Sequence, residues 1–265
     1  MRIAAGILIL VSLTAARSEQ IPNPAPKDEV RVRTLTLVTD ELPQADRKLV
    51  VNSLRNQAYS PGEFEELVRL QLRNLGYAYA RVEDAELTSV REQNKDKSAD
   101  VSVKVEPGAQ YRLGSIRFKG ATLFPPEQLR SQFPLQTGSF FCATSIQRGL
   151  ERLRTLYEEK GYINFGAIPK TEADDAHHII DLVVDMDEGS KFVFGHLVLD
   201  GIEPHAGDGQ ALVASWSNVQ GKTYNPELLQ NWLASNWPGG KEALNRMKAL
   251  QETEPHQVNI RLQFP

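Results

Sequence analysis

The sequence predicts an α+β fold of three tandem modules, each with a three-stranded mixed sheet covered by two helices in the order strand, helix, helix, strand, strand. In each module, alternating apolar and polar residues flank two amphipathic stretches. A Gly-Tyr pair follows a charged helical stretch at Gly76-Tyr77 and again at Gly161-Tyr162, 85 residues later. A triplet of evenly spaced glycines, Gly108, Gly114 and Gly120, recurs 81 residues later as Gly189, Gly195 and Gly201. Two markers with nearly one period indicate an internal repeat.

The first 29 residues precede the repeat. Arg2 and the apolar run Ile3–Leu13, followed by small residues up to Ala16, predict a secretory signal peptide over residues 1–16. The apolar run is shorter than the roughly 20 residues that a membrane-spanning helix needs, although an N-terminal anchor is the alternative. Residues 17–29 contain three alternating prolines and are expected to form an extended linker.

The first module is predicted over residues 30–106. Its opening strand, 32–38, alternates between apolar and polar residues, which is typical of a strand with one buried face. Ser60 precedes Pro61, and Glu63 follows in the first turn, a pattern that begins helices. We expect helices over 45–57 and 61–74, and strands over 77–88 and 99–105 joined by a polar loop at 91–98.

The second module is predicted over residues 107–190. Its long helix places Ile146, Leu150, Leu153 and Tyr157 on one apolar stripe. The opening strand is expected at 113–118, the helices at 125–132 and 145–159, and the closing strands at 162–170 and 178–186 around a loop at 171–176.

The third module is predicted over residues 191–265, where no Gly-Tyr pair occurs. The alternation over 258–264 identifies its last strand. The opening strand is expected at 194–199, the helices at 208–217 and 226–235, and the second strand at 244–251.

Composition and motifs argue against several classes of function. With 41% hydrophobic and 24% charged residues and a net charge of -4, the chain resembles an ordinary folded protein and not a nucleic-acid-binding one. The single cysteine, Cys142, cannot form an internal disulfide and is expected to be a small buried apolar residue. Asp174-Asp175 and His177-His178 lie in a predicted polar turn. We therefore expect no catalytic site, no metal, no cofactor and no small-molecule substrate.

Three segments of the repeat resemble the polypeptide-transport-associated (POTRA) domain. Tyr111–Gly120 is similar to the opening strand of such a domain, Tyr157–Ile163 to its helix-to-strand corner, and Asp181–Gly189 to its last strand. The resemblance is strongest over residues 107–190, good over 30–106 and weaker over 191–265.

The resemblance implies an exported protein in the periplasm that is associated with the outer membrane. In the family, these domains precede an outer-membrane β-barrel, whereas this sequence stops at Phe264-Pro265, at the end of the third unit, so we expect no barrel in this chain. The expected role is a scaffold in outer-membrane protein assembly or polypeptide translocation. Its expected partners are an outer-membrane β-barrel protein or unfolded client polypeptides. The alternatives are a barrel-less remnant of an assembly protein, or an envelope or cell-division scaffold, although related cell-division proteins normally carry one unit.

The expected binding mode is β-augmentation, in which an extended peptide adds to an exposed sheet edge. The family's topology implies that the second strand of each module is this edge, at about 78–86 and 163–170. Charges and prolines on these strands also suit an edge that is merely protected against aggregation, so both interpretations stay open. The candidate contact residues are Tyr79, Arg81, Glu83, Asn164, Gly166 and Ile168.

Overall fold

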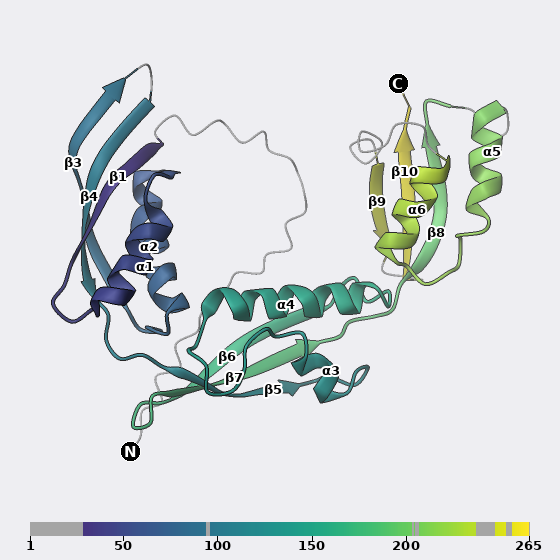
Figure 1. The fold of residues 1–265 in the computed structure, drawn as a ribbon. Coiled ribbons are helices and arrows are strands. Elements are labelled where there is room, and N and C mark those ends of the chain that lie inside the picture. The colour runs from purple at the N-terminus through teal and green to yellow at the C-terminus, as the bar shows by residue number, and fades with distance from the viewer. Residues whose placement is uncertain are drawn as a thin grey trace. The chain divides into compact units, whose positions relative to one another are not determined.

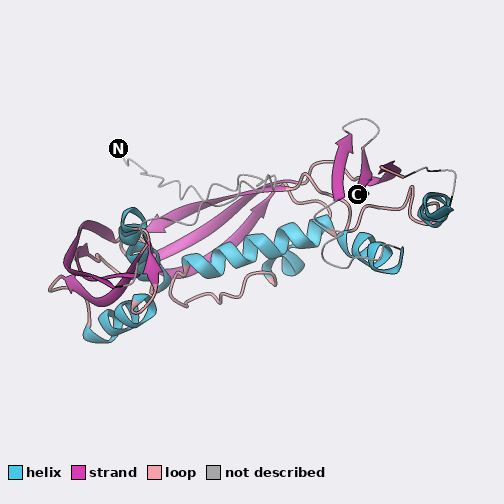
Figure 2. Ribbon diagram, turned by 90° about the horizontal axis from the view of Figure 1, so that it is seen from above, coloured by secondary structure: helices cyan, strands magenta, loops and turns pink. Residues whose placement is uncertain are grey.

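The computed structural model describes residues 29–93, 96–202, 204, 207–236, 247–252 and 256–264 (Figure 1). The predicted signal peptide, 1–16, and the linker except for Glu29 lie outside the described residues. Among the described residues, no helix is both long enough and apolar enough to cross a membrane. The helices and strands are shown in Figure 2, and each module follows the predicted order strand, helix, helix, strand, strand, with one extra short strand in the first module. The chain divides into two compact units, and the boundary between them passes through the second module.

The first module packs helices α1 and α2 on one face of a sheet with the strand order β2-β1-β4-β3 (Figure 1). Strand β1 runs parallel to β4, and β3 is antiparallel to β4 at the edge. Helix α2 buries Phe64, Val68 and Leu72, four residues apart, against this sheet. The elements are β1 (Val30–Val38), α1 (Gln44–Leu54), β2 (Ala58–Tyr59), the 3-10 helix η1 (Pro61–Glu63), α2 (Phe64–Asn74), β3 (Arg81–Gln93) and β4 (Asp96–Glu106).

Several boundaries in the first module differ from the prediction, beginning with α1, which ends at Leu54 instead of at residue 57. Strand β3 begins at Arg81 instead of at residue 77, because the turn continues: the Ala78 N–H donates to the Gly76 carbonyl and the Ala80 N–H donates to the Tyr77 carbonyl. The predicted loop 91–98 is wrong where it is described, since 91–93 and 96–98 pair as strands. These residues are polar, so apolar alternation could not reveal them. The two-residue strand β2 was also not predicted.

The second module has the sheet order β5-β7-β6, so its second strand is again at an edge. The predicted stripe on α4 is confirmed, because Ile146, Leu150, Leu153 and Tyr157 are all buried. Strand β6 starts four residues later than predicted and includes 171–174, which were expected to be a loop. The elements are β5 (Arg112–Lys119), α3 (Pro126–Arg130), α4 (Ala143–Glu158), β6 (Gly166–Asp174) and β7 (Ile179–Asp187).

The third module has the sheet order β8-β10-β9. Its core contains Trp216 and Trp232, whose rings meet edge-to-face at 4.8 Å. Residues 237–246 lie outside the described residues, so only part of the predicted strand 244–251 can be compared with the structure. The elements are β8 (Val193–Asp200), α5 (Gly207–Trp216), α6 (Pro226–Asn236), β9 (Met247–Glu252) and β10 (Gln257–Gln263).

The middle glycine of each repeated triplet allows a close approach between the first and last strands of its module. A Cβ on Gly114 would overlap the carboxylate of Asp181, which accepts the Ser115 N–H at 2.5 Å. A Cβ on Gly195 would likewise overlap the Asn259 amide, which accepts the His196 N–H at 2.6 Å. The repeated middle glycine therefore leaves room for a polar side chain of the last strand, which accepts a hydrogen bond from a backbone N–H of the first strand.

Candidate functional site

A glycine closes the helix before the edge strand in the first two modules. Gly76 (φ 94°) and Gly161 (φ 89°) both adopt the left-handed conformation that ends helices. Their carbonyls accept the N–H groups of Tyr111 and Phe192, the residues that open the following module, both at 2.8 Å. A Cβ on Gly161 would lie 2.8 Å from the Phe192 carbonyl oxygen, so this approach requires glycine. Each corner is therefore bonded to the residue that opens the following module.

Tyr79 packs at the corner that precedes β3 instead of lying in the strand. Its ring meets the Tyr111 ring edge-to-face at 5.1 Å. The Tyr111 hydroxyl donates to Asp175 at 2.7 Å, and the His178 ring meets the Tyr111 ring at 5.5 Å. Burial, with a smaller contribution from Asp175, raises the pKa of Tyr111 to about 12. Burial is also the main cause of the raised pKa of Tyr79. This corner is therefore a partly dry aromatic cluster.

The edge strand β3 exposes Arg81 and Glu83, but parts of its backbone are already bonded. The Arg69 guanidinium donates to the Val82 carbonyl at 3.1 Å, and the Ala85 N–H donates to the Glu65 carboxylate at 3.1 Å. The pairing with β4 is interrupted twice, between Glu83 and Glu86 and between Thr88 and Arg91. Asp84 and Ser89 in these interruptions have φ values of 54° and 50°. Bulges and side-chain bonds of this kind protect a sheet edge.

The edge strand β6 has a more regular backbone. Asn164 lies in the turn before the strand, and Gly166 is its first residue. Ile168 is 59% exposed, the largest fraction among the exposed large apolar side chains of the described residues. None of residues 166–174, all of which are described, has a positive φ. Pro169 lacks a backbone N–H, which limits what this edge can donate.

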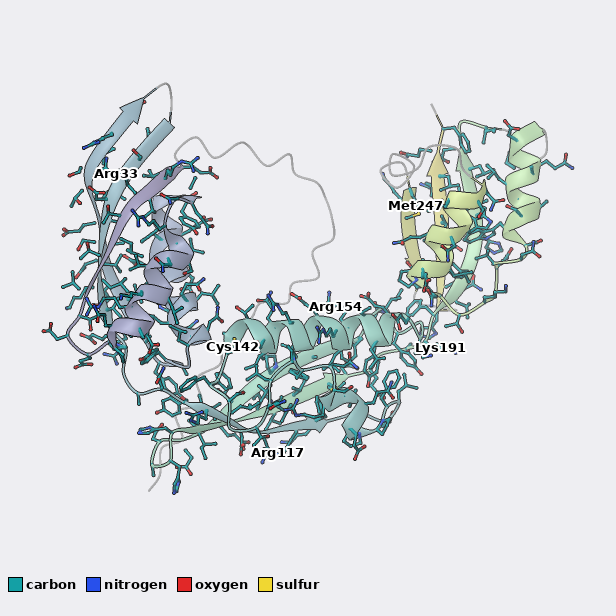
Figure 3. All side chains as sticks on the ribbon, viewed as in Figure 1. Arg33, Arg117, Cys142, Arg154, Lys191 and Met247 are labelled. Carbon is teal, nitrogen blue, oxygen red and sulfur yellow. The ribbon has the colours of Figure 1, made fainter. Side chains whose placement is uncertain are left out.

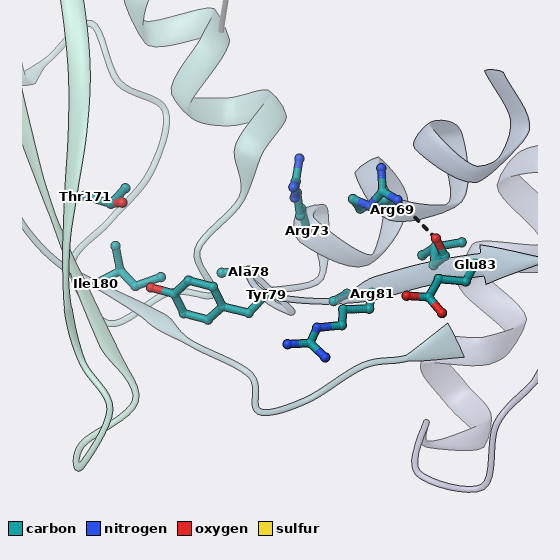
Figure 4. A pocket seen from close by; sticks show the side chains of 10 residues that line it. Arg69, Arg73, Ala78, Tyr79, Arg81, Glu83, Thr171 and Ile180 are labelled. Atoms are coloured by element: carbon teal, nitrogen blue, oxygen red, sulfur yellow. Dashed lines mark hydrogen bonds between the residues drawn. The ribbon is translucent and has the colours of Figure 1, made fainter. Parts of the chain in front are cut away.

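A pocket of about 520 Å³ lies beside the start of β3 (Figure 4). Arg73 and Arg81 are its least engaged cations. The contact from Arg73 to Glu66 is 3.5 Å long, the one from Arg81 to Glu106 is 3.9 Å, and the buried Arg73 Nε has no hydrogen-bond partner among the described residues. The pocket is lined by Arg69, Arg73, Ala78, Tyr79, Ala80, Arg81, Val82 and Glu83 of the first module, and by Thr171 on β6 and Ile180 on β7.

The side chains that carry reactive chemistry in the sequence have structural partners. The His177 ring contacts Asp174 at 2.8 Å, and within the described ranges no group of three His, Cys, Asp or Glu side chains is suited to hold a metal ion. Cys142 is half-buried, not fully buried as predicted, and its Sγ lies 3.7 Å from the Asn74 side chain (Figure 3).

Sequence reasoning did not identify the pocket. Arg69 and Arg73 lie one turn apart on α2, and Arg81 follows the Gly76-Tyr77 corner. The cluster of three arginines around this helix-to-strand corner is the sequence feature from which a positively charged pocket could have been predicted. The contribution of Thr171 and Ile180 could not be inferred, because it depends on how the second module folds back to this corner.

The chain is similar to known proteins of outer-membrane assembly. Residues 111–189 match the POTRA family, described as "Surface antigen variable number repeat". The outer membrane protein assembly factor BamA of Buchnera aphidicola subsp. Acyrthosiphon pisum (strain APS) is 23% identical over 184 residues, which cover 68% of this chain and 29% of that protein. A relative in Treponema pallidum (strain Nichols), provisionally named an outer membrane protein assembly factor, is 24% identical over 127 residues, which cover 48% of this chain and 15% of the relative. The chain thus matches less than a third of the length of either relative.

Among solved structures, POTRA domains 3–5 of Haemophilus influenzae BamA share the fold. That crystal structure superposes with a TM-score of 0.60 at 17% identity, covering 89% of this chain and 96% of the other. The resemblance predicted from the sequence is therefore confirmed: the chain carries a POTRA domain at residues 111–189 within the fold of a tandem POTRA array.

Proposed function

We propose that the chain is a non-enzymatic periplasmic scaffold in outer-membrane protein assembly or polypeptide translocation. The POTRA match and the outer-membrane assembly names of the relatives support this role. Its proposed partners are outer-membrane proteins or their unfolded precursors. Export by a signal peptide at residues 1–16 and association with the outer membrane are parts of the same proposal.

The proposed mechanism is β-augmentation, and one observation carries it. Within the described residues, the second strand lies at the sheet edge in all three modules, where one side of the strand has no neighbouring strand of its own sheet. The best edge is β6, where Gly166 and Ile168 are followed by a continuous extended backbone. Asn164 would contact the peptide just before the strand. Tyr79, Arg81 and Glu83 would contact it from beside the β6 edge, because Thr171 of β6 lines the same pocket.

A photo-crosslinking amino acid at Ile168 tests this proposal. Leu49 on helix α1 is the matched control, since it is also an exposed aliphatic residue (55% against 59%) but offers no strand edge. We expect an unfolded outer-membrane protein to be captured at Ile168 and not at Leu49. Equal capture at the two positions would indicate contact with any exposed apolar side chain and would refute edge binding.

A further inference from the structure

The pocket beside β3 combines positive charge with an apolar floor. The pocket lining contains three arginines, Arg69, Arg73 and Arg81, and one acidic residue, Glu83. Arg69 is occupied by Glu66 and by the Val82 carbonyl, which leaves Arg73 and Arg81 as the available donors. In Figure 4 the Tyr79 ring extends toward Ile180, with the guanidinium groups of Arg73 and Arg81 on either side of it in this view.

The position of the pocket favours a polypeptide as its occupant. Its walls include the residues that lead into β3 and Thr171 of the edge strand β6, so a chain paired with β6 would reach the pocket directly. Guanidinium groups bind carboxylates in a bidentate geometry, and the bond to Arg73, whose side chain is 29% exposed, is less screened by water than one in open solvent. An aliphatic or aromatic side chain would in turn pack against the half-buried Tyr79 ring.

We propose that this pocket selects an acidic side chain two residues away from an apolar one in the extended segment bound at β6. Alternate residues of a strand lie on the same face, about 7 Å apart, so an acid-x-apolar sequence presents both groups to the pocket together. The carboxylate binds Arg73 and Arg81, and the apolar side chain packs on Tyr79. The inference rests on the proposed edge binding and adds a sequence preference to it.

Three synthetic peptides of equal length test the preference against the full chain. One carries Glu-Ser-Leu, the second carries Gln-Ser-Leu, and the third carries Glu-Leu-Ser, in which the acid and the leucine lie on opposite faces. We expect the first to bind roughly tenfold more tightly than either of the others, as for one charge-assisted hydrogen-bonded contact. We also expect this advantage to shrink at high salt.

Two protein variants locate the effect. Arg81→Gln should remove most of the difference in affinity between the Glu-Ser-Leu and Gln-Ser-Leu peptides. The Arg81 side chain is 76% exposed, so the fold should tolerate the change. Arg91→Gln, an exposed arginine at the far end of β3, should leave the difference intact.

The outcomes separate the two proposals. Equal affinity of the three peptides, with binding still captured at Ile168, would overturn the pocket preference and leave edge binding in place. Absence of binding by any extended peptide would overturn both. If the Arg81→Gln variant still binds the Glu-Ser-Leu peptide more tightly than the Gln-Ser-Leu peptide by the same factor, the peptide carboxylate binds elsewhere and the pocket assignment is overturned. A preference for a C-terminal carboxylate over its amide, without any effect of the internal acid, would do the same.

Discussion

The edge strands β3 and β6 hold the same place in their modules but present different backbones. In β3, the side chains of Arg69 and Glu65 bond main-chain groups, and two interruptions place Asp84 and Ser89 in left-handed conformations. In β6, the backbone stays extended through all nine residues from Gly166 to Asp174, and Ile168 is exposed. One topology can therefore yield a protected edge and an accessible one.

The difference shows that an edge position alone does not define a binding site. Edge strands are a general hazard, and proteins close most of them with charges and bulges. An edge whose backbone stays extended while it exposes a large aliphatic side chain is a better candidate for a partner. We therefore expect polypeptide to bind the second module in preference to the first.

The largest expected effect concerns the sheet that carries β6. Asp181→Ala removes the acceptor of the Ser115 N–H and of the Ser115 hydroxyl, and we expect it to lower the free energy of unfolding by about 2 kcal/mol. Asp100→Ala, at the corresponding place in the first module, removes a partner of the Arg33 guanidinium and should have a smaller effect. Urea unfolding of both variants measures this, and a larger loss for Asp100→Ala would reverse the comparison.

Acid should weaken the second module through Glu188. Burial alone would raise the pKa of this carboxyl, but hydrogen bonds from Thr122, the Leu123 N–H and Tyr157 outweigh it and lower the pKa to about 2. Because the pKa falls on folding from its ordinary value of 4.5, the stabilisation is complete above pH 4.5 and is lost as the pH falls from there toward 2. After allowance for partial exposure, we expect a loss of about 1 kcal/mol.

Glu188→Gln is the control for this pH dependence. The variant should be less stable than the natural chain at pH 7, and the gap should narrow at pH 3.5. Urea unfolding followed by NMR signals of the second module would show this, and a gap that stays constant would contradict the assignment.

Pro169 tests whether β6 is partly protected. Pro169→Ala restores one backbone N–H, which should strengthen binding of an extended peptide roughly threefold if that group faces the partner. Calorimetric titration measures the change. Unchanged affinity would indicate that the peptide does not use this part of the edge.

The smallest effect is expected at β3. Glu65→Ala frees the Ala85 N–H, and we expect peptide capture by a photo-crosslinker at Glu86 to rise roughly twofold while capture at Ile168 stays constant. Strong capture at Glu86 in the chain with Glu65 intact would show that β3 is open and would break the comparison.

The sequence predicts the modules well but the edges poorly. Helix stripes such as Leu150, Leu153 and Tyr157 depend on local periodicity, which a single sequence carries directly. The bulges at Asp84 and Ser89 depend on the pairing partner, and the bonds from Arg69 and Glu65 depend on helix packing. Neither leaves a local pattern. For the same reason, Tyr79 and Asn164 were predicted in strands although they lie in turns.

The most direct test of main-chain pairing at β6 compares one extended peptide with its twin methylated on alternate backbone nitrogens. Methylation removes donors along one edge and leaves the side chains unchanged. The account predicts that the methylated twin binds at least roughly tenfold more weakly and is no longer captured at Ile168. Equal affinity and equal capture of the two peptides would contradict it.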